Sequence, residues 1–294
     1  RGPDVRNDLN FQMSKPPVSS VSIVKRGLDG EEERKDLVVA EQPLEIKVGY
    51  GNEEDRGQMS LSVTMRTPGH DLELVAGFLF AEGIIDTPGQ LLALDHCQNV
   101  KSEDEAGNVV RAELSPEVEL DLELLQRNSL ASSSCGVCGK ASIEALAHLQ
   151  CESFPKGEKP ALDPGVIKDL PRRLREAQTV FRHTGGIHAT GLFDLEGNLA
   201  LMREDVGRHN ALDKVIGAKF LRGELPLSGL IGLCSGRLGF ELVQKSLRAG
   251  LPILGAVGAP SSLAVETASQ YGMTLLGFVR EGRFNEYAGM TSEG

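Results

Sequence analysis

Tryptophan is absent from this sequence of 294 residues, aromatic residues make up only 4% of it, and positive charge is in short supply. Lysine and arginine number 31 against 42 aspartates and glutamates. The resulting net charge of −11 argues against a general nucleic-acid-binding surface, which needs clustered cations. No apolar run approaches the roughly 18 residues of a membrane-spanning helix, and residues 1–10 lack the apolar centre of a signal peptide. We therefore expect neither nucleic acid nor a membrane as a partner.

Cysteine is scarce as well, and it is unevenly distributed. An odd number of cysteines at irregular spacing in a chain of this length is not typical of a disulfide framework. The sequence therefore indicates a reducing compartment, and we expect a cytoplasmic protein. Cys97 and Cys234 lie in apolar surroundings and are interpreted as small buried hydrophobic residues. The five cysteines are Cys97, Cys135, Cys138, Cys151 and Cys234.

The apolar fraction of 40% is sufficient for a substantial core, and the length fits one large or two ordinary domains. Residues 1–12 precede a methionine that is a plausible native start, and they are interpreted as a non-native or disordered leader. Residues 13–126 are predicted to form a smaller α+β domain. Residues 127–140 are predicted to be a mobile loop, and residues 141–294 a larger α/β domain.

The first part of the chain contains short β-branched or alternating segments separated by glycine, proline and charged residues, which predict strands. Apolar residues at 72, 75, 76, 79 and 80 predict a helix over 72–81, which Asp71 or Thr67 can cap. The predicted strands are 21–25, 37–40, 44–48 and 61–65, followed after the helix by a pair at 91–100 and 109–114.

In the last part of the chain, apolar strands alternate with amphipathic helices, which is typical of a largely parallel sheet covered on both faces. A hairpin within 187–203 is expected to supply an antiparallel edge. The predicted elements are helices 141–149 and 166–178, strands 187–193 and 199–203, helix 210–221, strand 230–233, helix 238–249, strand 252–257, helix 262–271 and strand 274–278.

A pair of cysteines marks the predicted loop. Residues 135–139 have the sequence Cys-Gly-Val-Cys-Gly, follow three serines and precede Lys140. No bulky side chain is available there to cover the thiols. A neighbouring cation or helix N-terminus lowers the pKa of a thiol and favours the reactive thiolate. The pattern therefore indicates sulfur chemistry at Cys135 and Cys138, which are the candidate catalytic residues.

A metal site is the alternative for the same cysteines. Together with His183 or His188 they could form a structural zinc centre, although an isolated Cys-x-x-Cys is only half of such a site. Zinc-dependent deaminases need His-x-Glu followed by Pro-Cys-x-x-Cys. Here the cysteines come first, Ser134 precedes them, and alanine and threonine follow His188. Deaminase chemistry is therefore not indicated, whereas a zinc-stabilised module that binds a nucleotide or a protein stays open.

Two predicted strands of the last part end in turns of small residues. Residues 233–237 contain Ser235 and Arg237, and a second turn spans 257–262. Ligands of open α/β sheets bind at the carboxyl ends of the strands, where backbone N–H groups and an arginine can hold an anion. Ordinary tight turns are the competing interpretation. The chain has neither a Walker motif nor a complete Gly-x-Gly-x-x-Gly, so a standard nucleotide-binding motif is not supported.

Three further segments are unusually rich in polar groups. Residues 203–210 hold two arginines, two carboxylates, a histidine and an asparagine, and Asp205 is a candidate for ligand binding or for a helix cap. Residues 181–188 place two histidines, including His188, around a Gly-Gly turn. Residues 278–284 follow the last predicted strand with two arginines and two aromatic rings that could grip phosphate and stack on a base.

Taken in order, these motifs resemble the FdhD family, the formate dehydrogenase accessory sulfurtransferases. The resemblance extends from about residue 41 to residue 287. It implies a cytidine-deaminase-like, three-layer α/β domain without deaminase chemistry. The segments that carry it are 41–44, 67–68, 74–79, 82–83, 135–139, 184–188, 203–214, 235–237 and 277–283.

The resemblance also implies a function. A cysteine desulfurase would load a sulfane sulfur onto Cys135 as a persulfide, with Cys138 accepting the sulfur or assisting its release. The protein would pass this sulfur to the molybdenum of bis(molybdopterin guanine dinucleotide), a bound substrate that is then inserted into the formate dehydrogenase catalytic subunit. The resemblance implies a homodimer with no permanent metal. It assigns cofactor contact to Phe278, Val279, Arg280, Glu281, Gly282 and Arg283.

Overall fold

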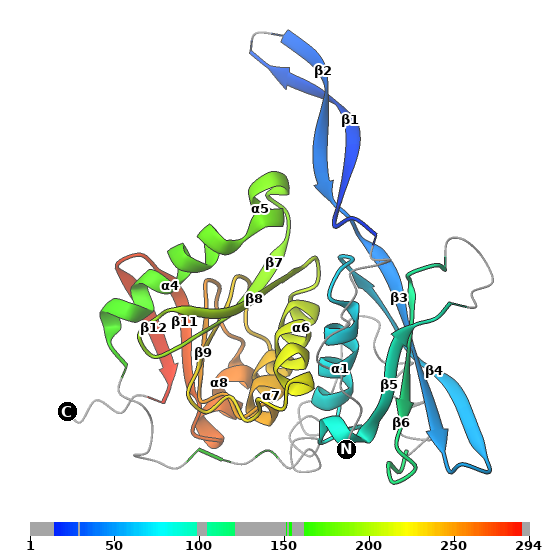
Figure 1. The fold of residues 1–294 in the computed structure, drawn as a ribbon. Coiled ribbons are helices and arrows are strands. Elements are labelled where there is room, and N and C mark those ends of the chain that lie inside the picture. Colours follow the sequence, from blue (N-terminus) through cyan, green and yellow to red (C-terminus); the bar gives the residue numbers. More distant parts are fainter. Residues whose placement is uncertain are drawn as a thin grey trace.

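The protein is described by a computed structural model that covers residues 15–28, 30–98, 105–120, 151, 153–154 and 162–289. Three sheets organise these residues (Figure 1). A two-stranded ribbon pairs β1 with β2, a four-stranded sheet has the order β4-β3-β6-β5, and a six-stranded sheet has the order β12-β11-β10-β9-β7-β8. Helices lie between and beside the two larger sheets, so the α/β class predicted from the sequence is confirmed. Its cytidine-deaminase-like character stays a prediction.

The first part of the chain forms the predicted strands and helix. In β3 the alternation of apolar residues buries Leu44, Ile46 and Val48 on one face. The elements are β1 (Val18–Gly27), β2 (Gly30–Val39), β3 (Gln42–Gly51), β4 (Arg56–Arg66), α1 (Asp71–Ala81), the 3-10 helix η1 (Pro88–Gln90), β5 (Leu91–His96) and β6 (Val109–Leu114).

The cap predicted for α1 is wrong. The helix begins after His70, which has a left-handed backbone and provides no side-chain cap. Both predicted capping residues are engaged elsewhere. The Asp71 carboxylate accepts two hydrogen bonds from Arg66, and the Thr67 hydroxyl accepts one from the Val206 backbone N–H.

The last part of the chain contains two elements that the sequence did not predict, α5 and β12. The first is too short to show a helical period, and the second is a largely exposed edge strand. Within the described ranges, no helix has both the length and the apolar character needed to cross a membrane. The elements are α4 (Pro164–Ala177), α5 (Thr179–Thr184), β7 (His188–Phe193), β8 (Leu199–Asp205), α6 (Arg208–Leu221), β9 (Ile231–Cys234), α7 (Phe240–Arg248), β10 (Ile253–Ala256), α8 (Ser262–Gln270), β11 (Thr274–Arg280) and β12 (Arg283–Ala288).

The six-stranded sheet is mixed, which corrects the expectation of a largely parallel sheet. Parallel ladders join β9 to β10 and β10 to β11. Strand β7 is antiparallel to both of its neighbours, and β12 is antiparallel to β11. Short turns connect β7 to β8 and β11 to β12, and strands connected in this way must run in opposite directions. The predicted hairpin does supply an edge, because β8 is the outermost strand.

Helices cover both faces of this sheet (Figure 1). On one face, Ile167, Leu170 and Leu174 of α4 pack against a cluster that includes Phe193 and Leu233. On the other face, α6, α7 and α8 share a second cluster with β7, β9, β10 and β11, and this cluster continues into α1 and the four-stranded sheet. One hydrophobic core therefore joins the two larger sheets. The predicted domain boundaries at 126 and 140 fall outside the described residues and stay predictions.

Helices α1 and α6 pack unusually closely. A Cβ atom placed on Gly77 would lie 1.9 Å from the Asp213 carbonyl oxygen, and one placed on Gly217 would lie 1.8 Å from the Glu73 carbonyl oxygen. Both contacts are with backbone atoms that cannot rotate away. The two glycines therefore allow the helix backbones to touch where the first and last parts of the chain meet.

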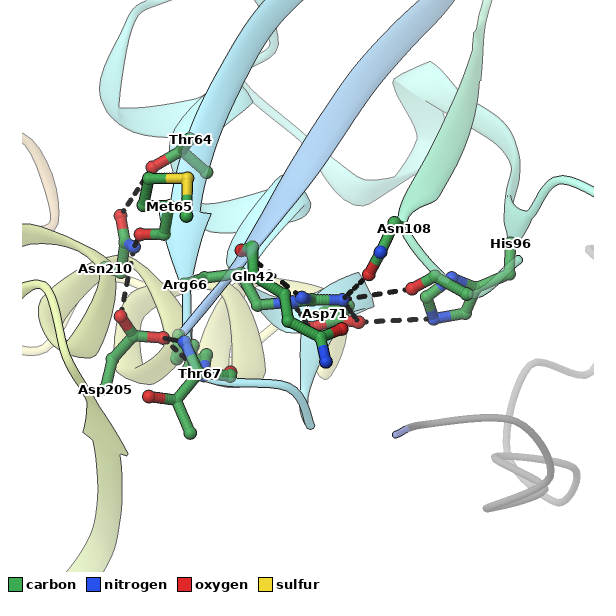
Figure 2. Close-up of polar contacts among 12 residues, drawn as sticks. Gln42, Thr64, Met65, Arg66, Thr67, Asp71, His96, Asn108, Asp205 and Asn210 are labelled. Carbon is green, nitrogen blue, oxygen red and sulfur yellow. Dashed lines mark hydrogen bonds and ion pairs between the residues drawn. The ribbon is translucent and has the colours of Figure 1, made fainter. Parts of the chain in front are cut away.

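A buried ion pair lies beside this helix contact. Lys214 Nζ is 2.7 Å from Asp205 Oδ2, and the two side chains are 1% and 0% exposed. Asp205 also accepts hydrogen bonds from the Thr67 backbone N–H and the Asn210 amide, as Figure 2 shows. Lys214 donates to the Thr67 carbonyl oxygen. The carboxylate therefore ties the end of β8 to the connection between β4 and α1.

We expect Lys214→Met to lower the free energy of unfolding by about 3–5 kcal/mol, because it leaves the Asp205 carboxylate buried without a cation. The matched control is Lys219→Met, which removes a lysine 2.6 Å from the partly exposed Glu224 and is expected to cost less than about 1 kcal/mol. Denaturant unfolding monitored by circular dichroism measures both changes. Equal losses in the two variants would contradict the assignment of a structural charge pair.

Candidate functional site

The candidate site lies at one edge of the six-stranded sheet. Strands β8 to β11 end at this edge and β7 begins there, because β7 runs opposite to its neighbours. The turns that follow β9, β10 and β11 are joined by hydrogen bonds. The Gly258 N–H donates to the Gly236 carbonyl oxygen, and the Phe278 N–H donates to the Gly258 carbonyl oxygen. The nitrogen–oxygen distance is 3.0 Å in both hydrogen bonds. The edge is therefore a connected set of turns.

A pocket of about 1140 Å³ opens between this edge and the helices α4 and α5. It is somewhat larger than the roughly 300–1,000 Å³ that is usual for small-molecule sites. Four arginines and two glutamates line it, so the pocket is cationic on a protein whose net charge is −11. This contrast favours an anionic ligand. The charged lining residues are Arg172, Arg175, Arg182, Arg280, Glu176 and Glu281.

Glu204, near the end of β8, holds the wall formed by α5. Its two carboxylate oxygens accept hydrogen bonds of 2.9 Å from the backbone N–H groups of Val180 and Phe181. These N–H groups belong to the first turn of a helix and have no partner inside it. Through this contact β8 fixes the position of α5, which contributes Phe181 and Arg182 to the pocket.

The four arginines differ in how strongly they are already engaged. Arg172 forms ion pairs with Asp169 and Glu176. Arg175 lies over the Phe181 ring, 5.7 Å from its centroid.

Arg182 donates a hydrogen bond to the Glu176 carbonyl oxygen. For Arg280, which is exposed, no acidic partner exists among the residues that the structure describes. Its guanidinium is therefore the lining cation that is most available to an anion.

His188 and Ser235 form the floor of the pocket where β7 and β9 meet. The Ser235 hydroxyl accepts a hydrogen bond of 2.9 Å from the Ala189 backbone N–H. A Cβ atom at Gly236 would lie 3.2 Å from His188 Nδ1, so a glycine gives the imidazole its space. Burial and, to a smaller extent, the nearby Arg208 lower the pKa of His188. The imidazole is therefore predominantly neutral at neutral pH.

The structure brings half of the predicted ligand-binding residues together. His188, Ser235, Val279, Arg280 and Glu281 all line the pocket. The other half lie outside its lining, and these are Asp205, Arg237, Phe278, Gly282 and Arg283.

Those five residues occupy different positions. Arg237 is exposed, and its Cα and side chain pack against Gly258. Phe278 has a left-handed backbone with φ of 50° and a 36% exposed side chain. Gly282 and Arg283 are exposed at the turn between β11 and β12. Asp205 is fully buried, which gives it a supporting position behind the pocket.

The predicted anion-binding turn over 257–262 has few free N–H groups. Val257 and Gly258 donate their N–H groups to carbonyl oxygens of the preceding turn. Ser261 caps α8 by accepting a hydrogen bond from the Ala264 N–H. An anion in the pocket would therefore be held mainly by arginine side chains and not by backbone N–H groups of this turn. Most of those arginines belong to α4 and α5.

Sequence reasoning missed the wall formed by α4 and α5. Three arginines within 172–175 on an amphipathic helix were a visible signal, and two of them line the pocket. Their proximity to β11 depends on how α4 crosses the sheet, which the sequence pattern does not reveal.

Two of the cysteines that the structure describes, Cys151 and Cys234, are poor candidates for sulfur chemistry. Cys234 is buried, and this burial raises the pKa of its thiol to about 11. Burial also raises the pKa of Cys151. Cys97 is partly buried and not in a disulfide. Cys135, Cys138 and the predicted mobile loop lie outside the described residues, so their roles and the zinc alternative stay predictions.

Comparisons with known proteins agree on one family. The FdhD/NarQ family model matches residues 39–292. "Sulfur carrier protein FdhD" of Streptomyces avermitilis is 45% identical over 257 residues, which is 87% of this chain and 88% of the relative. The proteins of the same name from Corynebacterium efficiens and Sulfurisphaera tokodaii are 47% and 40% identical, over 87% and 92% of this chain and 90% and 96% of those relatives.

A solved structure has the same fold. It is a crystal structure from Desulfotalea psychrophila whose description names a formate dehydrogenase accessory protein. The two structures superpose with a TM-score of 0.68 at 24% sequence identity, over 94% of this chain and 99% of the other. Together with the family model and with relatives that match at 40–47% identity, this leads to one conclusion. The chain belongs to the FdhD/NarQ family.

Proposed function

We propose that this protein is a sulfur carrier for formate dehydrogenase maturation. It would receive persulfide sulfur from a cysteine desulfurase and transfer it to bis(molybdopterin guanine dinucleotide) before that cofactor enters the formate dehydrogenase catalytic subunit. The observation that carries the proposal is the 40–47% identity, over most of the chain, to proteins named as sulfur carriers. Cysteine usage supports the cytoplasm as the compartment.

Cys135 is proposed as the acceptor of the sulfur. Its thiolate attacks the outer sulfur of the desulfurase persulfide. A new S–S bond forms on Cys135, the S–S bond of the donor breaks, and the donor cysteine leaves as a thiolate, so no net oxidation takes place. The raised thiol pKa values of Cys151 and Cys234 disfavour either of them as the acceptor.

Cys138 is proposed to assist release. Its thiolate attacks the inner sulfur of the Cys135 persulfide, which forms a disulfide between the two cysteines and expels the outer sulfur as hydrosulfide. The molybdenum of the bound substrate would accept that sulfur. A cellular dithiol would then return the disulfide to two thiols by a two-electron exchange.

The cationic pocket is proposed to hold the cofactor. Diphosphate groups need cations with several donors, and arginines supply them in a forked geometry. Arg280 and Glu281 line the pocket, and they belong to the segment 278–283 to which the family resemblance assigns cofactor contact. His188 and Ser235 would contact the ligand from the floor, and Asp205 would support it by fixing the end of β8.

Persulfide loading tests the sulfur-carrier proposal. The full chain is incubated with a cysteine desulfurase and cysteine, and its intact mass is then measured without reductant. The expected result is a product one sulfur atom heavier than the starting protein. Unmodified thiols after this treatment, together with stoichiometric zinc in protein purified without chelator, would instead favour the zinc-stabilised binding module.

We expect Arg280→Ala to weaken the binding of GDP, a guanine diphosphate probe for the cofactor, by about tenfold. Among the residues that the structure describes, Arg172, Arg175 and Arg182 are engaged by an ion pair, a ring or a carbonyl oxygen, whereas the exposed Arg280 guanidinium is not. One charge-assisted hydrogen bond contributes roughly 1.5–3 kcal/mol. Isothermal titration calorimetry measures the affinity. Arg222→Ala, which removes an exposed arginine at the end of α6, is the control and should bind GDP as the wild type does. Identical affinities in the two variants would remove Arg280 from the proposed site.

A further inference from the structure

The ribbon formed by β1 and β2 extends away from the body of the protein (Figure 1). Its strands pair from Val18 opposite Val39 to Gly27 opposite Gly30. Val24, Leu37 and Val38 on the ribbon are 39–48% exposed. A two-stranded ribbon by itself is at best marginally stable in water, whereas three or more strands with a hydrophobic face can be stable. The ribbon would therefore gain stability if a further strand paired with one of its edges.

The two outer edges of the ribbon differ in charge. Residues 31–36 of β2 are six consecutive charged residues, which is a common means of blocking further strand pairing. Residues 18–24 of β1 have the sequence Val-Ser-Ser-Val-Ser-Ile-Val and carry no charge. Among the described residues, no strand other than β2 pairs with β1. The open edge of β1 is therefore suited to pairing with another strand.

We propose that the partner is a second copy of this chain, which pairs its own β1 antiparallel to β1 with Val21 opposite Val21. The sequence of 18–24 is nearly the same in both directions. Antiparallel pairing about Val21 therefore places Val18 opposite Val24 and Ser20 opposite Ser22. Such self-complementarity is what a two-fold symmetric interface requires. The product is a four-stranded sheet in which both β1 strands are central.

The charges of the ribbon agree with this register. In this register, Lys25 and Arg26 of one copy lie opposite Pro17 and Pro16 of the other copy. The ladder of hydrogen bonds ends there because proline has no N–H group to donate. Like charges are therefore not brought together. The charged segment of β2 lies on the two outer edges of the new sheet, where charge prevents further growth.

The proposal goes beyond sulfur transfer. The family resemblance implies a homodimer without naming a surface, and the family match begins at residue 39, after nearly all of the ribbon. Strand β2 also contacts α5, which forms part of the pocket wall. A second copy that pairs with the ribbon would therefore also stabilise the position of α5 in the pocket wall.

The test compares the oligomeric state of three full-length proteins by sedimentation velocity over a concentration series. Wild type is expected to form a dimer. Val21→Lys is expected to raise the dimer dissociation constant by about tenfold or more, because it removes two valines from the interface and places like charges opposite each other. Within one chain, the new lysine would still lie opposite Asp36, so the ribbon itself is retained. Leu37→Lys adds the same charge to β2 and should leave the dimer unchanged.

Cross-linking tests the register independently. Val21→Cys is expected to give a disulfide-linked dimer under mild oxidation, whereas Leu37→Cys and wild type should not, because Leu37 and its counterpart would lie three strands apart. A monomeric wild type would overturn the proposal and point to a different protein as the partner. A dimer that persists unchanged in Val21→Lys would also overturn it. Persulfide loading is measured separately on the same proteins, so failure of the sulfur-carrier proposal would leave these outcomes unaffected.

Discussion

Cys135→Ala is expected to abolish persulfide loading completely, since the variant lacks the thiolate that attacks the desulfurase persulfide. Two of the remaining thiols are unsuited to replace it. Burial raises the pKa of Cys151 and that of Cys234, so both stay protonated and poorly nucleophilic at neutral pH. Intact-mass measurement after incubation with desulfurase and cysteine should therefore find the variant at its starting mass.

Two control variants separate loading from release. Cys151→Ala should load sulfur to the wild-type extent, because its thiol does not take part. Cys138→Ala should retain a persulfide on Cys135 and release it slowly, because the thiolate that expels hydrosulfide is missing. If Cys135→Ala still gained one sulfur and Cys138→Ala did not, the roles of the two cysteines would have to be exchanged.

Gly217→Ala is expected to destabilise the protein by about 3 kcal/mol, the upper end of the usual cost of overpacking. A single methyl group at this position would lie 1.8 Å from the Glu73 carbonyl oxygen and 2.6 Å from the Gly77 nitrogen. Side chains often relieve such contacts by changing rotamer, but backbone atoms of a packed helix cannot. The helices α1 and α6 would have to separate, and the apolar contacts around them would loosen with them.

The control for this prediction is Gly229→Ala, in a turn where an added Cβ atom has no neighbour within 4 Å. We expect its free energy of unfolding to stay within about 0.5 kcal/mol of the wild-type value. Chemical denaturation followed by circular dichroism compares the two variants under identical conditions. A Gly217→Ala protein as stable as Gly229→Ala would mean that the helices are not in the close contact described above.

Much of the fold could be predicted from local sequence patterns. The helical spacing of apolar residues indicated α1, and short apolar runs that end in small residues indicated β9 and β10, in which every residue is buried. The direction of the strands was harder to predict, since it depends on which strands become neighbours in space. Strand β7 lies between β8 and β9 and runs opposite to both, and β12 runs opposite to β11, so the sheet is mixed.

The candidate site was predictable where it follows strand ends and unpredictable where helices cross them. His188 begins β7, Arg280 ends β11 and Ser235 directly follows β9, so their convergence follows from topology. Arg182 reaches the same pocket only because Glu204 anchors α5 through backbone N–H groups. Asp205 resembled a ligand-binding residue in the sequence, yet Lys214 engages it in the interior. The presence of a charged residue in the sequence therefore does not reveal whether its side chain lines the pocket or lies in the protein interior.

The contact between Gly77 and Gly217 limits how this protein can be re-engineered. A chimera that took its pocket from one relative and its first hundred residues from another would have to bring both helices from the same parent, since each surface is fitted to the backbone of the other. Expression of residues 164–289 alone would also leave Lys245 and Arg248 without their contacts to Glu82 and Asp86 of the first part. The two parts of the described chain therefore have to be kept together in any chimera, and the pocket cannot be transferred to another protein by itself.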